Sequence, residues 1–178
     1  MTEMPQHLHP LKGNHQIQYY ENDDNLVHAI TISIEEALRS NQGFLIIASK
    51  ENNAEFQRLL TERGWDVDRF FKLGQLILLD VKIILERLMI HHVLDTEMLH
   101  SLLWGEVNLM QKKFPKVKAY GEMVKTFWKD NNLHGMITVD RIWKKLSDDL
   151  NFSLLTAYSM QHLDDEKYGI AFHDVIQK

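Results

Sequence analysis

Two carboxylates stand where predicted buried strands end, a position that often carries chemistry in α/β proteins. Asp80 lies near the end of the segment GQLILLDV, and Glu122 follows the segment VKAYG. Ligands of open α/β sheets bind beyond the carboxyl ends of the strands, so both side chains are candidates for ligand contact. As a pair they could exchange protons with a substrate. Each also has a structural interpretation: Asp80 as the cap of the next helix, which we favour, and Glu122 as a first-turn acid stabilised by the helix dipole.

The loops after the predicted strands are polar and mixed in charge, and the first of them argues against nucleotide chemistry. A phosphate-binding loop reads G-x-x-x-x-G-K-[ST], because its glycines let backbone N–H groups close around phosphate. Here the chain reads ASKENNAEF, which has no glycine and places Glu51 where a phosphate would lie. The sequence therefore disfavours nucleotide hydrolysis of the P-loop kind. No G-x-G-x-x-G pattern supports dinucleotide binding either.

Ten histidines raise the question of a metal site. His7 and His9 form an H-x-H pair near the N-terminus, and His91 and His92 are neighbours in a predicted helix, where adjacent side chains point in different directions. No H-E-x-x-H or comparable spacing occurs, and the chain has no cysteine. We favour surface or capping histidines and predict no metal and no cofactor. A nucleophilic serine also lacks its G-x-S-x-G elbow.

Four mainly apolar segments have the length of strands, GFLIIAS, GQLILLDV, VKAYG and FSLLTAYS, and the first of them is a continuous apolar run. Strands without polar alternation are buried on both faces, as in a parallel sheet covered by helices. The segments between them have helical periodicity, among them VKIILERLMIHHVL, and DEKYGIAFHDVI is expected to be the last helix. Strands that alternate with helices predict an α/β fold of three layers with a mainly parallel sheet. Residues 1–14 are expected to be a loose lead-in, and residues 15–178 a single domain.

The length and composition are those of an ordinary globular protein, with 178 residues, 44% of them hydrophobic and 25% charged. The net charge of −5 weighs against direct nucleic-acid binding, which needs a basic surface. No apolar run reaches the roughly 18 residues of a membrane span, and the polar N-terminus lacks the apolar core of a secretory signal. The absence of cysteine suits a reducing compartment, so we expect a cytoplasmic protein with no membrane partner.

The segments VKAYGEMVKTFWKDNN and VDRIWKKLSDDLNFSLLTAYS resemble the MEDS family, sensory domains named for methanogens, methylotrophs and the dichloromethane regulator DcmR. The family pattern R-A-[FY]-G-E-M-V-x-x-L-W is met over residues 119–128. The pattern F-S-L-L-C-A-Y-P is met over residues 152–158, with Thr156 in place of cysteine and Ser159 in place of proline. The resemblance spans about residues 13–176, nearly the whole chain.

Other parts of the chain extend this resemblance and what it implies. His15 and Tyr20 match the family's opening H-x-x-x-x-Y segment, and FHDVI matches its closing segment at His173. The family implies a RecA/KaiC-like core that lacks a working Walker A loop, in agreement with the glycine-free loop. Its members occur in bacterial and archaeal signalling proteins, joined to DNA-binding domains or histidine kinases, or alone. The resemblance therefore implies sensing or regulation, with a histidine kinase or a transcription regulator as output partner.

Our leading hypothesis is a non-catalytic sensory module that binds an unknown small molecule or a signalling partner at the carboxyl edge of the sheet. In this hypothesis Glu122 and Tyr120 face the ligand. Five further residues are candidate neighbours of the same ligand: His15, Tyr20, Asp80, Tyr158 and His173.

Two other functions stay open. The first is a protein-interaction subunit, such as a homodimer without a small ligand, which predicts an apolar patch around Trp104, Trp128 or Trp143. For the last two tryptophans a packed core is the favoured interpretation. The second is a hydrolase or transferase that uses Glu122 with Asp80, which requires the two carboxyl groups to lie close together in an open cleft.

Overall fold

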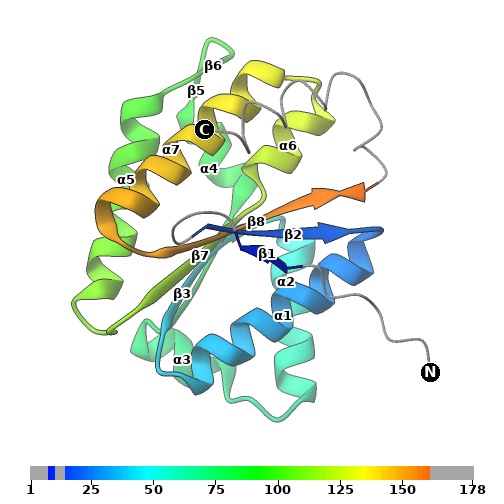
Figure 1. Cartoon of the computed structure of the whole chain (residues 1–178), viewed down its shortest axis with the longest axis vertical. Helices are drawn as coiled ribbons and strands as arrows, with labels where there is room; N and C mark the ends of the chain where they lie inside the picture. Colours follow the sequence, from blue (N-terminus) through cyan, green and yellow to red (C-terminus); the bar gives the residue numbers. More distant parts are fainter. Residues whose placement is uncertain (1–7, 11–14, 161–178) are drawn as a thin grey trace.

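The computed structural model describes residues 8–10 and 15–160, which form a six-stranded sheet with helices on both faces (Figure 1). The strands of this sheet are β1 (Leu8–Pro10), β2 (His15–Tyr20), β3 (Gly43–Ala48), β4 (Leu76–Asp80), β7 (Val117–Gly121) and β8 (Ser153–Ser159). Their order is β1-β2-β8-β7-β3-β4, and every neighbouring pair except β1 with β2 is parallel. The predicted α/β fold with a mainly parallel sheet is confirmed.

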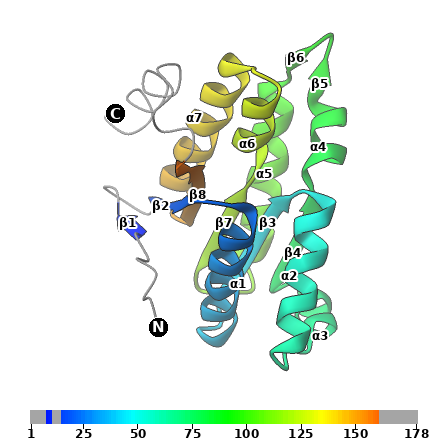
Figure 2. The same cartoon turned by 90° about the vertical axis from the view of Figure 1, so that its right-hand side faces the viewer.

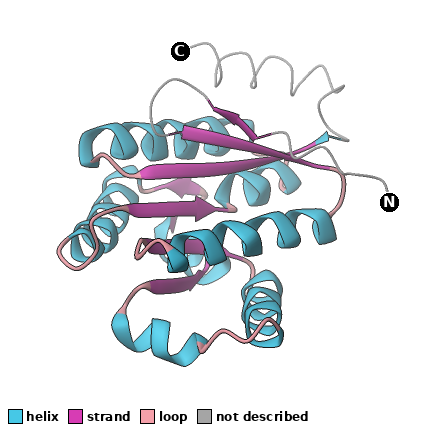
Figure 3. Cartoon of the chain, turned by 60° about the horizontal axis from the view of Figure 1, so that its bottom comes forward, coloured by secondary structure: helices cyan, strands magenta, loops and turns pink. Residues whose placement is uncertain are grey.

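Helices form two outer layers, one on each face of the sheet (Figures 2 and 3). The helices are α1 (Asp23–Arg39), α2 (Lys50–Glu62), α3 (Val67–Leu73), α4 (Val81–Leu88), α5 (Thr96–Gln111), α6 (Met123–Lys129) and α7 (Leu133–Leu150). One face is covered by α1, α2 and α3, and the other by α4 to α7. The fold therefore has three layers, as the sequence predicts.

The central strand β3 shows why its sequence has no polar alternation. All six of its residues are buried, because helices cover both faces and strands β4 and β7 flank both edges. Phe44 and Ile46 pack toward α1–α3, whereas Leu45 and Ile47 pack toward α4–α7. Each such side chain contributes about 1.5–3 kcal/mol to folding, so β3 is the strand on which both cores depend.

Polar caps fix the corners where strands pass into helices. Six residues that precede helices accept a backbone N–H of the first helical turn through their side chains: Asn22, Ser49, Asp66, Asp80, Asp95 and Asn132. Three of them, Asn22, Ser49 and Asp80, lie just beyond the carboxyl ends of parallel strands, so they shape the edge where ligands bind in this type of sheet. Among the residues that the structure describes, no helix has both the length and the apolar character needed to cross a bilayer.

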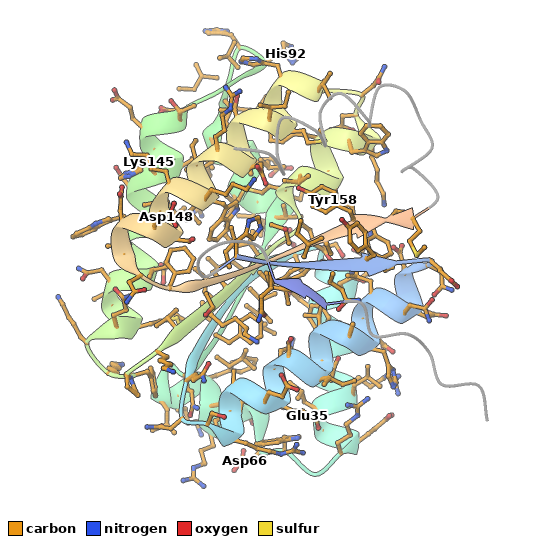
Figure 4. The ribbon with its side chains drawn as sticks, viewed as in Figure 1. Glu35, Asp66, His92, Lys145, Asp148 and Tyr158 are labelled. Carbon is orange, nitrogen blue, oxygen red and sulfur yellow. The ribbon has the colours of Figure 1, made fainter. Side chains whose placement is uncertain are left out.

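Three segments differ from the expectation, and the first is His15–Tyr20, which forms β2 although no strand was predicted there. The predicted helix VKIILERLMIHHVL is wrong beyond Leu88: the chain forms a two-stranded hairpin of β5 (Met89–Ile90) and β6 (Val93–Leu94) instead. Its turn residues His91 and His92 have φ of 49° and 66°, the left-handed values that a tight two-residue hairpin requires (Figure 4). Residues 8–10 of the expected lead-in form β1. The helix expected over DEKYGIAFHDVI lies outside the described residues.

Candidate functional site

A pocket of about 260 Å³ opens at the carboxyl ends of β2 and β8, between the start of α1 and helix α6. Its lining residues come from three parts of the chain: Tyr20, Glu21, Asn22 and Asp23 after β2, Val124, Lys125, Trp128 and Lys129 on α6, and Ala157 and Ser159 on β8. The pocket therefore lies at the edge of the sheet that the sequence predicts for a ligand.

The polar side of the pocket connects α6 to α1. The amide oxygen of Asn22 accepts the backbone N–H of Asn25 at 2.9 Å, which starts α1 directly after β2. The Nζ of Lys125 lies 2.6 Å from Oδ1 of Asp23 and 5.7 Å from the centre of the Tyr20 ring. The Asp23 side chain is mostly exposed, so this ion pair adds at most about 1 kcal/mol of stability. Its role is geometric, because it places a cation against an aromatic wall.

The apolar side of the pocket is formed by aromatic and aliphatic side chains. Tyr20 is buried, Trp128 is partly buried, and Val124 and Ala157 complete the surface between them. Lys129 is exposed at the end of α6 and brings a second positive charge to the rim. A cavity with an apolar wall and a few charged groups has the composition of a small-molecule site.

A second constellation lies where the loops after β3 and β7 diverge to opposite faces of the sheet. The chain leaves β3 into α2 on one face and leaves β7 into α6 on the other, which makes this the topological switch point of the sheet. The carboxylate of Glu122 fills it. Its Oε2 accepts the backbone N–H of Ser49 at 2.8 Å, and its Oε1 accepts from Nδ2 of Asn52 at 2.6 Å. The hydroxyl of Tyr120 donates to Oε1 at 3.2 Å.

The backbone around Gly121 explains how Glu122 reaches this place. The N–H of Glu122 donates to the carbonyl of Ile47 at 2.8 Å, so the ladder between β7 and β3 continues for one more residue. Its carbonyl then accepts the N–H of Thr126 at 2.9 Å and starts α6. A Cβ on Gly121 would lie 3.1 Å from the indole of Trp143, which is fully buried. A glycine is needed here because α7 packs directly on the backbone.

Electrostatics at the switch point match a carboxylate that is held by neutral donors. Glu122 is 3% exposed, and Tyr120 is 1% exposed. Burial, followed by the charge of Glu122, raises the pKa of Tyr120 well above its usual value, so this hydroxyl stays protonated and donates. The N-terminus of a helix after a β-strand is where parallel α/β proteins bind phosphate or carboxylate. In this chain the anion at that position belongs to the protein itself.

Two more predicted site residues lie on the sheet face that α7 covers. Nε2 of His15 and Oγ1 of Thr156 are 2.8 Å apart, and burial together with the charge of Lys144 lowers the pKa of His15 to about 4. The hydroxyl of Tyr158 donates to Oδ1 of Asp140 at 3.4 Å (Figure 4). Asp140 is 1% exposed and pairs with Nζ of Lys144 at 3.2 Å, and burial raises its pKa.

The remaining predicted residues stand apart from these groups. Asp80 accepts the backbone N–H groups of Lys82 and Ile83 at 2.8 and 3.4 Å, which confirms the expected cap of α4. Strand β3 lies between β4, which ends at Asp80, and β7, which Glu122 follows, so the backbones that carry the two carboxylates are roughly 10 Å apart across the sheet. His173 lies outside the described residues.

The six candidates that the structure describes thus fall into four groups: Tyr120 and Glu122 meet at the switch point, Tyr20 lines the pocket, His15 and Tyr158 face α7, and Asp80 caps α4. Sequence reasoning did not identify Asp23, Lys125 and Lys129 as pocket residues. Trp128, for which a packed core or an inter-helix seam was favoured, is partly buried against the core and also lines the pocket. Predicting a strand over residues 15–20 could have led to these pocket residues. Within the described parts of the chain, no three or more His, Asp or Glu side chains gather as a metal site would require.

The chain was compared with known protein families and with curated proteins. The family described as the MEthanogen/methylotroph, DcmR Sensory domain, abbreviated MEDS, matches residues 14–174. No curated protein matches the chain. The matched range contains the strands and helices that form both the pocket and the switch point.

Proposed function

Because this chain belongs to the MEDS family of sensory domains, we propose that it is a non-catalytic sensor that binds a small molecule in the pocket at the ends of β2 and β8. The position of this pocket is the observation that carries the proposal, since ligands of open parallel sheets bind beyond the carboxyl ends of the strands. Its volume of about 260 Å³ lies just below the range of roughly 300–1,000 Å³ for ligand pockets. The ligand is therefore small.

The lining of the pocket suggests the character of the ligand. Tyr20 and Trp128 offer flat apolar surface, while Lys129 and the pair of Asp23 with Lys125 offer charge. A molecule with an apolar part and one polar or charged group fits both sides. Of the residues that the sequence predicts as ligand neighbours, Tyr20 is the one that we propose as a direct contact.

In this proposal Glu122 holds the helix that forms one wall of the pocket. Its backbone starts α6, and the next two turns of that helix carry Val124, Lys125 and Trp128 into the pocket wall. Its side chain fixes the start of α6 to Ser49, ahead of α2. Direct contact of Glu122 and Tyr120 with a ligand stays a prediction, which requires the ligand to replace the partners of a carboxylate that is 3% exposed.

The non-catalytic assignment has its own support. An acid–base pair must place both groups within reach of one substrate, and a strand separates Asp80 from Glu122. The family's sensory role points the same way. We propose that ligand binding is passed to a separate output protein in the cytoplasm, a histidine kinase or a transcription regulator.

A thermal-shift screen of the full chain against small polar metabolites, with mass spectrometry of molecules that co-purify, tests the proposal. Trp128→Phe and Lys129→Ala change the pocket wall and its rim, and Lys145→Ala removes an exposed lysine of α7 as the matched control. A hit at about 100 times its Kd should stabilise the wild type by about 2.7 kcal/mol. Both pocket variants should weaken the shift and Lys145→Ala should leave it unchanged. Equal shifts in all four proteins would refute binding at this pocket.

A second candidate function is a protein-interaction subunit that needs no small ligand. Trp104 is 45% exposed on α5, and Met98 and Leu109 of the same helix are also exposed. Large exposed apolar side chains mark interaction surfaces when they form a patch. Trp143, by contrast, is buried in the core, as the favoured interpretation of its spacing predicts.

A further inference from the structure

Strand β4 is an open edge of the sheet within the described residues. It is the last strand in the sheet order and pairs with β3 alone (Figure 2). Its side chains at Ile77, Leu78 and Leu79 are partly exposed, whereas all residues of β3 are buried. An outermost strand presents a row of backbone N–H and C=O groups that have no partner in the sheet, and these can pair with another strand.

The hydrogen bonds to β3 show which peptide groups of β4 point outward. The carbonyl of Gln75 accepts the N–H of Phe44 at 2.7 Å, so residue 75 directs its backbone groups toward β3. The carbonyl of Leu79 points the same way, because it accepts Nδ2 of Asn53 at 2.9 Å at the end of β3. Directions alternate along a strand, so residues 76, 78 and 80 direct backbone groups away from β3. Leu76 is 1% exposed and the carbonyl of Asp80 begins α4, so the N–H and C=O of Leu78 are the pair that the open edge offers.

These outward groups are self-complementary. When two β4 strands run antiparallel with Leu78 opposite Leu78, the two leucines exchange a reciprocal pair of N–H···O=C bonds. This exchange is symmetric about residue 78, so one register satisfies both strands equally. A two-fold symmetric dimer requires such a relationship.

The side chains of β4 fit the same register. Ile77 of each strand lies opposite Leu79 of the other on one face, and the two Leu78 side chains meet on the opposite face, so these cross-strand pairs are aliphatic. β4 contains no proline, glycine or lysine, the residues that protect edge strands. Leu73 and Ile83 flank the strand and are 47% and 50% exposed, which extends the apolar surface beyond both of its ends.

We propose that β4 is the dimerisation edge of this protein, and that its occupant is the β4 strand of a second copy, paired antiparallel about Leu78 into one sheet that runs through both copies. The pocket lies at the ends of β2 and β8, near the opposite end of the sheet order. The dimer goes beyond the proposed sensory function and does not depend on it, so either proposal can fail while the other stands.

Sedimentation velocity of the full chain over a range of concentrations tests this directly. The wild type should sediment as a particle of twice the 21.0 kDa chain mass, and dilution should dissociate it into single chains. Leu78→Pro removes the outward N–H that the dimer uses, while the inward bonds to β3 come from residues on either side. Each copy loses one bond, so the dimer loses two, and its Kd should rise at least about tenfold.

Controls separate the edge from other surfaces and from misfolding. Leu109→Lys places a charge on an exposed leucine of α5 and should leave the dimer unchanged. Ile83→Lys changes an exposed residue next to the edge and should weaken the dimer without disturbing the core. Circular dichroism shows whether each variant folds. A wild type that stays a single chain at all concentrations, or a dimer that Leu109→Lys weakens and Leu78→Pro does not, would overturn the proposal.

Amide hydrogen exchange of the wild type needs no variant. In single chains the outward amide of Leu78 should exchange fast, whereas the inward amides of Ile77 and Leu79 are protected by β3. On dimerisation the Leu78 amide should gain protection of at least tenfold, in step with the mass from sedimentation. Fast exchange of the Leu78 amide at concentrations where the dimer is fully formed would show that another surface, or another partner class, accounts for it.

Discussion

The carboxylate of Glu122 accepts the backbone N–H of Ser49 at 2.8 Å, although 73 residues separate the two along the chain. This bond joins the loop after β3 to the strand end of β7 at the switch point of the sheet. A phosphate-binding loop needs glycines because its backbone must close around a ligand. Here a side chain of the protein supplies the anion and accepts the N–H of Ser49, while the hydroxyl of Ser49 accepts the N–H of Asn52.

Replacing Glu122 by alanine should destabilise the protein by at least about 2 kcal/mol. The change leaves the N–H of Ser49, the amide of Asn52 and the hydroxyl of Tyr120 without their buried acceptor, and each lost bond to a charged group is worth about 1.5–3 kcal/mol. Glu122→Gln keeps one acceptor oxygen and should cost less. Urea unfolding measures both free energies. Glu51→Gln on the exposed first turn of α2 is the control, and a loss as large as that of Glu122→Ala there would contradict the explanation.

Two glycine substitutions should change stability in opposite directions. Gly121→Ala places a Cβ 3.1 Å from the buried indole of Trp143, and overpacking of this kind costs about 1–3 kcal/mol. Gly105→Ala lies in the interior of α5 with no heavy atom within 4 Å of the new Cβ, so it should stabilise the protein by up to about 1 kcal/mol. Thermal melts of the two variants measure the difference. The same sign for both would argue against close packing at Gly121.

Because of His15, the free energy of unfolding should decrease as the pH falls. Its pKa is about 4 in the folded protein and 6.5 in an unfolded chain, so below pH 6.5 the unfolded state binds the proton first. The stabilisation is complete above pH 6.5 and is lost as the pH falls from 6.5 through 4. By pH 5 the loss from this residue should reach about 2 kcal/mol.

Urea unfolding at pH 7.5 and pH 5.0 isolates this contribution. His15→Gln keeps a donor for Oγ1 of Thr156 but does not titrate, so its stability should drop less than that of the wild type over this interval. His134→Gln changes an exposed histidine and should retain the full drop. Equal drops in the wild type and His15→Gln would show that His15 is not the group that titrates.

The layers of the fold could be predicted because their signals are local. β3, β4, β7 and β8 are mainly apolar runs, and such runs occur where helices cover both faces of a sheet. β2 was missed as a strand because HQIQYY has one aliphatic residue, Ile17, and depends on pairing with β8 far along the chain. The β5–β6 hairpin was missed because its turn uses two histidines where glycine or asparagine is usual.

The candidate site was less predictable, because its contacts depend on segments that are far apart in the sequence. The strand-end rule pointed to the carboxyl edge of the sheet and to Glu122, and the family resemblance added Tyr20, which lines the pocket at that edge. It could not show that Lys125 on α6 meets Asp23 on α1, because that contact requires β2 to lie beside β8. It also could not show that Glu122 turns toward Ser49 rather than toward an open cleft, since the two diverging loops meet only in the folded sheet.

The opposite edge of the sheet, at β1, determines whether further copies can add once two copies have paired through β4. β1 has three residues, runs antiparallel and ends at Pro10, which has no backbone N–H to donate. Within the described residues β4 is thus the one sheet edge suited to pairing, and in the proposed dimer the reciprocal contact occupies it in both partners. Assembly then closes at two copies, and the protein is protected from the fibres that two adhesive edges would allow.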